Sequence, residues 1–472
     1  MTHMHVAGSI HADVTSAAPQ WLVKPADANA LADGLWSGTV HRSGAGELRI
    51  GGMSASEILE QTGSPVYVID ELDFRGRALT WREDFAGWKV YYAGKSFLCG
   101  AVARWIAEEG LYLDVCSLGE LTVALRAGFE PARIGLHGNN KSDDLLRLAL
   151  SEGVGRIIVD SPDEIARLER LTAELGVRAE VLVRVTTGVE AHTHEYIATA
   201  HEDQKFGFSI AGGQALVALV RCYGSPNIDL RGVHSHIGSQ IFDTNGFEVA
   251  ARRTLRLLSQ FKEATGQALA ELDLGGGFGI AYTIDDSPAP AADLARGLEE
   301  IVAHECRAFG LERPELSIEP GRAISGPPGT ALYTVGTTKV VDLGGGQSRR
   351  YISVDGGMSD NIRPALYAAE YSAVLANRVS AETAVLSRVV GLHCEGGDIL
   401  VRDVFLPRDL AVGDIVAVPA SGAYSRSMAS NYNHTPRPPV VSVRDGRLAT
   451  IIRRETLDDV LAFDTCLSQS TR

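Results

Sequence analysis

Hydrophobic and polar residues alternate along the chain in two patterns, and the first runs from Val90 to Gly321. Short apolar runs are separated there by longer stretches whose apolar residues recur at helical spacing. The runs predict buried strands and the stretches predict amphipathic helices. The predicted strands span 89–93, 111–115, 134–138, 156–159, 180–186, 230–237, 270–274 and 315–319. The predicted helices include 100–109, 118–127, 142–152, 162–175, 247–264 and 291–309.

Eight strands that alternate with helices favour an α/β fold, in which right-handed crossovers build a parallel sheet. The repeats occupy roughly 240 residues, which suits a (β/α)8 TIM barrel of typically ~250 residues. A doubly wound open sheet is the alternative. We therefore predict a (β/α)8 barrel.

After Gly321 the helical spacing gives way to short alternating apolar runs divided by turn residues such as Gly344–Gly346. This pattern is typical of an all-β domain. The runs lie at 333–342, 350–354, 385–391, 415–418 and 440–443. Strand-like runs at 48–50 and 65–70, with a helical pattern at 54–61 between them, precede the barrel. We expect them to join a separate, mostly antiparallel β-domain. The predicted parts are a flexible leader (1–30), an N-terminal segment of the β-domain (31–84), the barrel (85–328) and the C-terminal β-domain (329–472).

Composition limits the possible partners. The chain has 472 residues, 45% of them hydrophobic, and a net charge of -15 from 44 basic and 59 acidic residues. We expect such an acidic protein to bind neither nucleic acid nor an anionic membrane. Its six cysteines are scattered without a C-x-x-C pair, which is typical of reduced thiols. No apolar run reaches the ~18 residues of a membrane span. The sequence therefore favours a cytoplasmic protein with a small-molecule ligand.

Candidate chemistry follows the predicted strands, where the β-α loops of a barrel form its active site. The run Val90–Phe97 leads to Lys95. A lysine at a dry strand end loses hydration and can hold a carbonyl compound as a Schiff base, whereas most lysines after a strand are solvated. The polar residues after the other strands are Asp114, Ser117, His137, Asn139, Asn140, Asp160, Ser161, His234–Ser239, Gly275–Gly279 and Glu319–Arg322.

The glycine run Gly275–Gly279 would let backbone amides approach an anion. Loops after strands seven and eight of a barrel often hold a phosphate. No Gly-Lys-Ser/Thr follows the run, so it is not a P-loop. A dinucleotide site would need an acidic residue about 20 positions on at a strand end, and Asp293 lies instead in a predicted helix. Dinucleotide binding is therefore disfavoured.

Two His-x-His pairs, His234–His236 and His192–His194, raise the question of a metal. Residues two apart on a strand share a face and could chelate an ion, with Asp273 or Glu319 as a third ligand. The alternatives are a packed core histidine or a ring that lies over a flat ligand. Because no third ligand is evident, we expect no metal.

Glu319 follows an apolar run, where a carboxylate is costly unless a cation pairs with it. That cation is either Arg322 or a protonated ring nitrogen of a ligand. A Schiff-base lysine, a phosphate-binding glycine loop, a stacking histidine and a carboxylate for a pyridinium together predict a pyridoxal phosphate site.

The same residues resemble the fold-type III pyridoxal phosphate-dependent decarboxylases, which pair an alanine-racemase-like barrel with a β-domain. Within that group the chain resembles the diaminopimelate decarboxylase family, from about Ile50 to Leu461. The most specific motifs are Gly188–Ile197, Asp203–Gly207, His234–Gln240, Glu319–Arg322, Asp355–Met358, Asn361–Tyr367, His393–Glu395 and Ser421–Tyr424. The resemblance implies decarboxylation of meso-2,6-diaminopimelate to L-lysine by a homodimer with active sites at the subunit interface.

The resemblance also implies a role for each site residue. Lys95 would carry the cofactor, His236 would cover one face of its ring, Glu319 would meet the ring nitrogen, and Cys394 or Lys95 would supply a proton. The implied cofactor-binding residues are Lys95, Asp114, His236, Ser239, Gly275, Gly276, Gly277, Glu319, Gly321, Arg322 and Tyr424. The implied substrate-binding residues are Arg322, Arg363, Tyr367, Cys394, Glu395 and Tyr424.

Three positions depart from the family pattern: Gly94 replaces the usual Ala, Gly396 the usual Ser, and Arg426 an aromatic residue. Decarboxylases of ornithine or arginine on the same fold are the nearest competing assignment, but their substrates have no distal carboxylate for Arg363 and Tyr367 to bind. Two more distant classes of protein compete with a decarboxylase: a non-catalytic cofactor-binding homologue and a metal-dependent barrel hydrolase.

Overall fold

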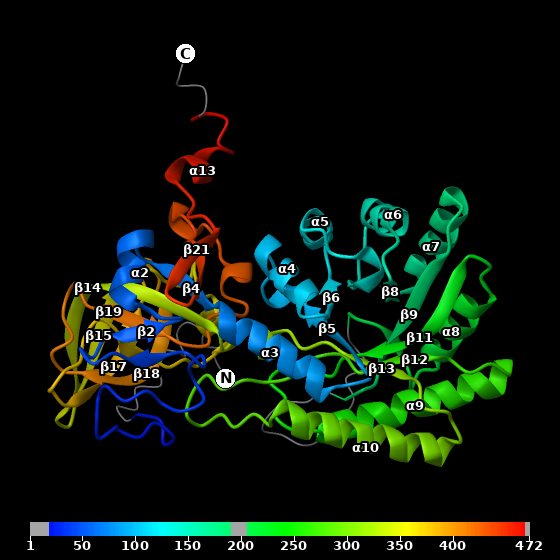
Figure 1. The fold of residues 1–472 in the computed structure, drawn as a ribbon, viewed down its shortest axis with the longest axis horizontal. Helices are drawn as coiled ribbons and strands as arrows, with labels where there is room; N and C mark the ends of the chain where they lie inside the picture. The colour runs from blue at the N-terminus through cyan, green and yellow to red at the C-terminus, as the bar shows by residue number, and fades with distance from the viewer. Residues whose placement is uncertain (1–17, 190–204, 468–472) are drawn as a thin grey trace, which may run out of the picture. The chain divides into compact units, whose positions relative to one another are not determined.

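A computed structural model describes residues 18–189 and 205–467. The chain divides into two compact units, which are described separately (Figure 1). The barrel unit comprises Arg75–Ile280 and Pro288–Ile324, and the β-unit comprises the other described residues. Among the helices of the described ranges, no helix is long and apolar enough to cross a membrane.

The barrel unit is built on a parallel sheet in the order β10-β9-β11-β12-β13-β5-β6-β7-β8, and pairing of β8 with β9 closes it. Eight of its strands match the eight predicted from the sequence, so the TIM barrel is confirmed. The strands are β5 (Lys89–Ala93), β6 (Tyr112–Val115), β7 (Ile134–Leu136), β8 (Arg156–Val159), β9 (Ala179–Thr186), β10 (Phe208–Ser209), β11 (Ile228–Ser235), β12 (Glu271–Asp273) and β13 (Glu315–Ile318).

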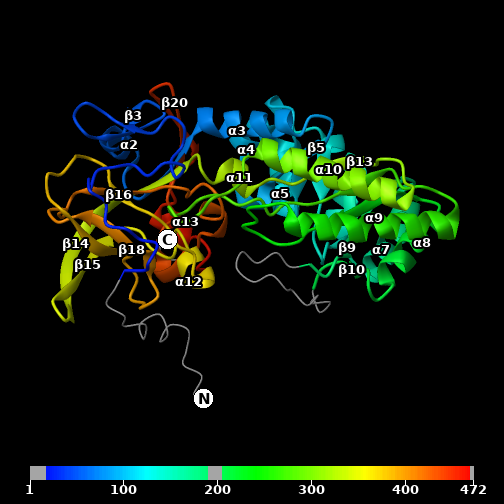
Figure 2. The same cartoon turned by 90° about the horizontal axis from the view of Figure 1, so that it is seen from below.

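Helices surround this sheet, and α9 and α10 lie side by side along it in Figures 1 and 2. Sequence-local signals set several of their ends. The hydroxyls of Ser117, Ser142 and Ser161 accept backbone N–H bonds at helix starts, and Gly153 and Gly176 end helices in the left-handed conformation. The helices are α3 (Glu71–Asp84), α4 (Gly100–Glu108), α5 (Leu118–Arg126), α6 (Asp143–Glu152), α7 (Pro162–Leu175), α8 (Gln214–Gly224), α9 (Asn245–Thr265), α10 (Ala291–Phe309) and α11 (Arg322–Ser325), with the short 3₁₀ turns η1 (Gly94–Ser96) and η2 (Pro131–Arg133).

The β-unit contains a small antiparallel sheet, β1-β2-β3, and a larger sheet in the order β18-β17-β15-β14-β4-β20-β21. β19 pairs with β14, and β16 pairs with β19. Only the pairs β15–β17 and β4–β20 of the described strands are parallel here, so the mostly antiparallel β-domain is confirmed. β4 comes from before the barrel but pairs with β14 and β20, which makes the unit discontinuous in sequence.

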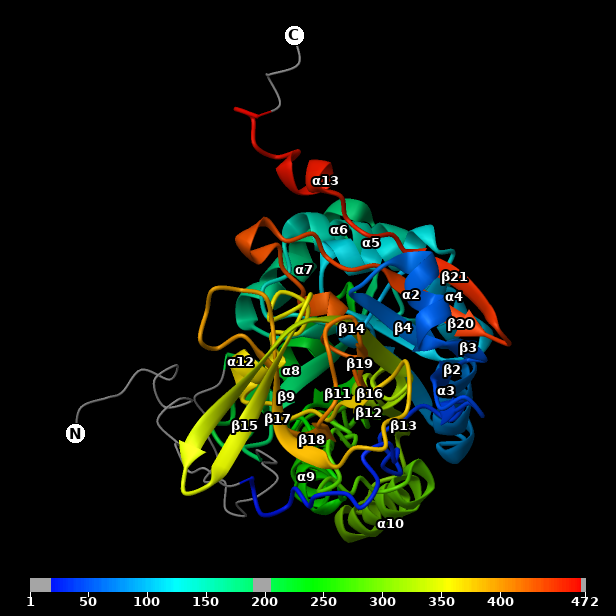
Figure 3. The same ribbon diagram turned by 90° about the vertical axis from the view of Figure 1, so that its left-hand side faces the viewer.

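Figure 3 shows β14 and β15 as two long adjacent strands. The β-unit core includes Leu48, Ile50, Val66, Val68 and Leu332. The strands of this unit are β1 (His41–Arg42), β2 (Leu48–Ile50), β3 (Met53–Ser54), β4 (Val66–Asp70), β14 (Gly329–Gly344), β15 (Gln347–Val354), β16 (Val374–Leu375), β17 (Ala384–Val390), β18 (Ile399–Pro407), β19 (Ile415–Val418), β20 (Val440–Arg444) and β21 (Arg447–Ile452). Its helical segments are α2 (Ala55–Thr62), α12 (Arg363–Tyr367), α13 (Leu457–Leu461), η3 (Arg426–Met428) and η4 (Tyr432–His434).

Candidate active site

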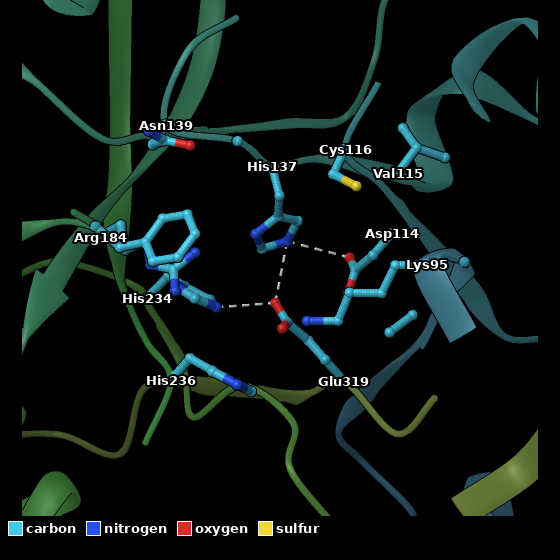
Figure 4. A pocket seen from close by; sticks show the side chains of 14 residues that line it. Lys95, Asp114, Val115, Cys116, His137, Asn139, Arg184, His234, His236 and Glu319 are labelled. Carbon is cyan, nitrogen blue, oxygen red and sulfur yellow. Dashed lines mark ion pairs between the residues drawn. The ribbon is translucent and has the colours of Figure 1, made fainter. Parts of the chain in front are cut away.

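A cavity of about 240 Å³ lies at the carboxyl ends of the barrel strands (Figure 4). Parallel strands bring residues far apart in sequence to this one end. Most of its polar lining residues sit in or directly after different strands, at the positions predicted from the sequence. The cavity is lined by Ala93, Gly94, Lys95, Asp114, Val115, Cys116, His137, Gly138, Asn139, Arg184, Phe206, His234, His236 and Glu319.

Lys95 enters this cavity from η1, immediately after β5. A Cβ atom on Gly94 would lie 2.7 Å from the carbonyl oxygen of Asp114, so only glycine allows the turn to approach β6 this closely. This contact gives a physical reason for the departure from Ala at position 94. The Lys95 side chain is exposed rather than dry, because the cavity opens to solvent. The expectation of a dehydrated lysine is therefore not met.

Glu319 is the centre of the charged groups in the cavity. Its Oε1 lies 3.1 Å from Nε2 of His137 and 3.0 Å from Nε2 of His234, as the dashed lines in Figure 4 show. Burial alone would raise the pKa of Glu319, but the two histidines hold it well below its usual value. Glu319 is therefore a carboxylate rather than a carboxylic acid at neutral pH.

The two histidines beside Glu319 differ in charge. His137 also lies 3.4 Å from Oδ1 of Asp114, and its ring meets that of His234 edge-on at 5.0 Å. Although burial lowers the pKa of His137, the carboxylates of Glu319 and Asp114 outweigh it and raise that pKa to about 10. Burial lowers the pKa of His234 to about 4 despite Glu319. His137 is thus an imidazolium, and the ring of His234 is neutral.

Asp114 is a buried carboxylate that lacks hydrogen-bond partners within the described residues. Neither of its carboxylate oxygens receives a hydrogen bond from residues of the described ranges. Burial and the nearby Glu319 raise the pKa of Asp114 to about 7. Two carboxylates share one imidazolium here, which leaves room for a further cationic or N–H donor group.

The turn Gly275–Gly277, called here the glycine cradle, lies beside Glu319. Cβ atoms on Gly275, Gly276 and Gly277 would come within 2.2, 2.3 and 2.4 Å of the carbonyl oxygens of Ser235, Glu319 and Gly238. Only glycines fit there, and the backbone N–H of Gly275 is held by Oδ1 of Asp273 at 2.7 Å.

The remaining barrel residues of the predicted site surround this cradle. The N–H of Gly276 donates to Nδ1 of His236 at 3.4 Å, and Arg322 donates to the hydroxyl of Ser239 at 2.9 Å. Burial and the nearby Lys95 lower the pKa of His236 well below its usual value, so its ring is neutral.

The predicted substrate residues Arg363, Tyr367, Cys394, Glu395 and Tyr424 belong to the β-unit. Arg363 begins α12 and is only 5% exposed, whereas Tyr367 ends α12 and is 62% exposed. Cys394 and Glu395 are exposed on the turn between β17 and β18. Tyr424 has a left-handed backbone with a φ of 58°. The candidate metal pair His192–His194 lies outside the described residues.

Sequence reasoning did not assign roles to His137, Arg184 or Phe206. Arg184 comes from β9, lies 3.9 Å from Oδ2 of Asp160 and stacks at 4.3 Å on the ring of Phe206. The position of His137 directly after a strand was the available signal, but its two carboxylate partners come from other strands. The metal interpretation required His234 to lie beside His236. Instead, His234 groups with His137 and Glu319, and these three residues bring possible metal-ligand atoms within 4.8 Å of one another.

Comparison with known proteins identifies the class. The family model described as pyridoxal-dependent decarboxylase, pyridoxal binding domain, matches residues 72–326. The fold and the cavity are thus those of a pyridoxal phosphate-dependent decarboxylase. The chain is 52% identical over 439 residues to diaminopimelate decarboxylase of Mycobacterium tuberculosis, with 92% of this chain and 98% of that protein covered. The chain belongs to the diaminopimelate decarboxylase family.

Other relatives agree with this assignment. Diaminopimelate decarboxylase of Bacillus subtilis is 46% identical over 431 residues, which cover 90% of this chain and 97% of that protein. The crystal structure of diaminopimelate decarboxylase from M. jannaschii in complex with L-lysine superimposes with a TM-score of 0.84 at 30% identity, covering 91% of this chain and 98% of that one.

The residues of the cavity fit pyridoxal phosphate. The buried Oε1 of Glu319 and both oxygens of Asp114 accept no hydrogen bond within the described ranges, so they can accept one from a ring N–H. The glycines of the cradle let its backbone pack against the carbonyl oxygens of Ser235, Glu319 and Gly238, and phosphate is an anion that glycine-rich backbone turns of this kind bind. Lys95 lines the same cavity, so its amine can reach a carbonyl group there.

We expect His137→Gln to destabilise the protein most at lower pH. The imidazolium persists to about pH 10 in the folded protein and loses its proton near pH 6.5 when unfolded. Its stabilising contribution is therefore full below pH 6.5 and lost as pH rises to 10. At pH 6.5 the unfolding free energy of His137→Gln should be about 3 kcal/mol below that of wild type, as for a broken buried ion pair.

Thermal unfolding of both proteins across this pH range is the measurement. His304→Gln, an exposed histidine on α10, is the matched control and should show no such dependence. A gap between wild type and His137→Gln that stayed constant from pH 6.5 to pH 10 would contradict the assigned charge.

Proposed function

We propose that this chain decarboxylates meso-2,6-diaminopimelate to L-lysine and carbon dioxide, the last step of lysine biosynthesis. The cavity with Lys95 and Glu319 at the barrel strand ends carries the proposal, in a chain 52% identical to a diaminopimelate decarboxylase. We also propose that the protein works in the cytoplasm as a homodimer with active sites at the subunit interface, as the family resemblance implies.

The barrel residues bind and orient the cofactor in this proposal. Lys95 would hold it covalently through Nζ, and His236 would cover one face of its ring. The phosphate group would bind to the glycine cradle and to the Ser239–Arg322 pair, where Arg322 supplies positive charge. Gly321 is needed for packing, because a Cβ there would lie 2.9 Å from the carbonyl oxygen of Ala93.

Pyridoxal phosphate, when bound, supplies an electron sink for the pair left behind as carbon dioxide departs. Glu319 keeps the proton on the ring nitrogen, because His137 and His234 hold Glu319 in its ionised form. Asp114 adds a second acceptor at the same end of the cavity. A proton must then be delivered to the substrate carbon that has lost its carboxylate, and Cys394 and Lys95 are the candidate donors.

Arg363 is the residue that favours a dicarboxylic substrate. Its guanidinium stacks at 4.7 Å on the ring of Tyr282 and donates to the hydroxyl of Tyr371 at 2.6 Å. Within the described ranges no carboxylate forms an ion pair with this nearly buried cation. A buried cation without a countercharge is costly, and a carboxylate of the substrate would supply one. Tyr367 and Glu395 would contact the rest of the distal end of the substrate.

Substitution of Arg363 tests the substrate. Lysine at this position would lose both the stacking and the forked bidentate contact that only a guanidinium makes. We expect Arg363→Lys to lower kcat/KM for meso-diaminopimelate about 10- to 100-fold, as for loss of a charge-assisted hydrogen bond of roughly 1.5–3 kcal/mol. Arg363→Ala should lower the ratio of kcat/KM for meso-diaminopimelate to kcat/KM for ornithine and for lysine.

Release of carbon dioxide from the three amino acids is the assay. Arg388→Lys is the matched control, because Arg388 is also nearly buried in the β-unit beside a tyrosine ring. It should leave the substrate ratio unchanged. If wild type preferred ornithine, or if the ratio did not depend on Arg363, decarboxylation of an ornithine- or arginine-type substrate would replace this proposal.

A further inference from the structure

The turn between β17 and β18 carries Cys394 and Glu395, and Asp398 closes it. The backbone N–H of Asp398 donates to the carbonyl oxygen of Glu395 at 3.1 Å, and its own carbonyl oxygen accepts from Gly391 at 3.0 Å. Oδ2 of the Asp398 side chain accepts the backbone N–H of His393 at 2.7 Å. Three contacts of one residue therefore hold the turn on both sides of Cys394.

The same carboxylate also reaches a second segment. Oδ1 of Asp398 accepts the backbone N–H of Met358 at 2.5 Å. Met358 lies five residues before Arg363, and the N–H of Arg363 is held in turn by the side chain of Asn361 at 3.2 Å. One buried carboxylate thus bridges the segment that leads to Arg363 and the turn that carries Cys394.

Further contacts reinforce this bridge. Nε2 of His393 lies 2.8 Å from the hydroxyl of Ser359, and Nδ1 lies 3.0 Å from Oδ1 of Asn433. The backbone N–H of Leu392 donates to the carbonyl oxygen of Gly356 at 3.0 Å. His393 is therefore fixed by side chains and backbone alike, one residue before the exposed thiol of Cys394.

Two glycines make space for the carboxylate. A Cβ on Gly357 would lie 2.7 Å from Oδ1 of Asp398, and one on Gly391 would lie 2.3 Å from Oδ2. Asp398 itself is 3% exposed. Both segments pack closely against this buried side chain, so its contacts are part of the protein interior and do not depend on a surface rotamer.

We propose that Asp398 is a positioning residue that joins the Met358–Arg363 segment and the Cys394–Glu395 turn into one rigid unit. The inference rests on the proposed function, in which Arg363 binds the distal carboxylate and Cys394 is a proton donor. The placement of each of these two groups then depends on one side chain that touches neither the substrate nor the cofactor. Because proton delivery is sensitive to small displacements, loss of the bridge lowers kcat.

Only a carboxylate makes this bridge. It accepts from both N–H groups at once, whereas asparagine has one accepting oxygen and one donating NH₂. Asp398→Asn keeps the volume of the side chain but turns its NH₂ group toward either the Met358 or the His393 N–H. One of the two links is lost, and a buried N–H is left without an acceptor.

The first measurement compares Asp398→Asn with wild type as holoenzymes. We expect kcat for meso-diaminopimelate to fall about 10- to 100-fold, the range for one lost charge-assisted hydrogen bond, while the cofactor absorbance stays unchanged. Asp414→Asn is the matched control, because Asp414 is also buried in the β-unit and accepts a backbone N–H, from Ala411 at 2.8 Å. It should keep the wild-type kcat.

A double-mutant cycle separates positioning from general damage. In a Cys394→Ala background, Asp398→Asn should lower kcat less than about 3-fold, because residues that act as a unit are not additive. The proposal would be overturned if the fold-decreases in kcat of Cys394→Ala and Asp398→Asn multiplied in the double mutant. A wild-type kcat in Asp398→Asn would overturn it as well. If Asp398→Asn does not fold, Ser359→Ala, which removes the contacts of this hydroxyl with His393 and Asp360, decides the same cycle.

The cycle also distinguishes this inference from the proposed function. If wild type released no carbon dioxide from meso-diaminopimelate, or if Cys394→Ala alone had no effect on kcat, the proposed function or the role of Cys394 would fail. If both behave as expected but the cycle is additive, only the role of Asp398 fails. Faster hydrogen exchange of 391–398 in Asp398→Asn than in Asp414→Asn is the expected readout without substrate.

Discussion

Lys95→Ala is expected to abolish turnover, with a loss of kcat of more than about 10³-fold, and to leave the cofactor bound only non-covalently. Lys95 is the lysine that lines the cavity within the described residues, and it stands on η1 directly after β5. Alanine has no amine to bind a carbonyl group. Glu319, His236 and the glycine cradle are untouched by the substitution, so cofactor affinity should fall without being lost.

Borohydride reduction followed by peptide mapping is the measurement, because it fixes the cofactor to the lysine that holds it. Lys89→Ala is the matched control, since Lys89 starts the same strand at the opposite end of the barrel and pairs with Glu315 at 3.0 Å. It should retain the covalent cofactor. Recovery of the label on Lys141 or Lys205 in wild type would show that Lys95 was wrongly assigned.

Glu319→Gln is expected to lower kcat far more than it weakens cofactor binding. An amide keeps the shape of the carboxylate but no longer favours a protonated ring nitrogen. The loss therefore falls on the transition state, and removal of such an electrostatic contact costs roughly 10²–10³-fold in kcat. His137 keeps its second carboxylate neighbour, Asp114, after this substitution.

Steady-state kinetics and cofactor titration by absorbance give the two quantities separately. Glu271→Gln is the control, because this buried carboxylate lies on β12 and pairs with Arg156 outside the cavity. It should change stability and leave kcat near the wild-type value. A wild-type kcat in Glu319→Gln would mean that Glu319 only neutralises charge within the barrel.

The barrel could be predicted because its signals are local. Each strand is a short apolar run such as Arg156–Val159, and helix starts such as Ser161–Pro162 carry their own caps. The α3 helix was missed because its apolar residues do not follow one face, and Leu72 is exposed. β18 was missed because charged residues, Arg402 and Asp403, interrupt its alternation.

The candidate site could be predicted in part. Lys95, His236 and Glu319 follow predicted strands, and the parallel order of a barrel brings such positions together whatever their separation in sequence. The partners of Glu319 could not be predicted this way. Whether a strand-end histidine faces a carboxylate depends on strand order and side-chain direction across the barrel, and His137 and His234 come from β-strands that are not sequence neighbours.

The amino-acid sequence alone determined the fold class, the cofactor chemistry and the positions of the lysine and carboxylate, since periodicity and motifs act over a few residues. The tertiary structure decided the charge states and the supporting contacts. The difference between an imidazolium at His137 and a neutral ring at His234 depends on burial and on distances to two carboxylates. The Asp398 bridge likewise joins amides 35 residues apart, at Met358 and His393, which only folding brings to one carboxylate.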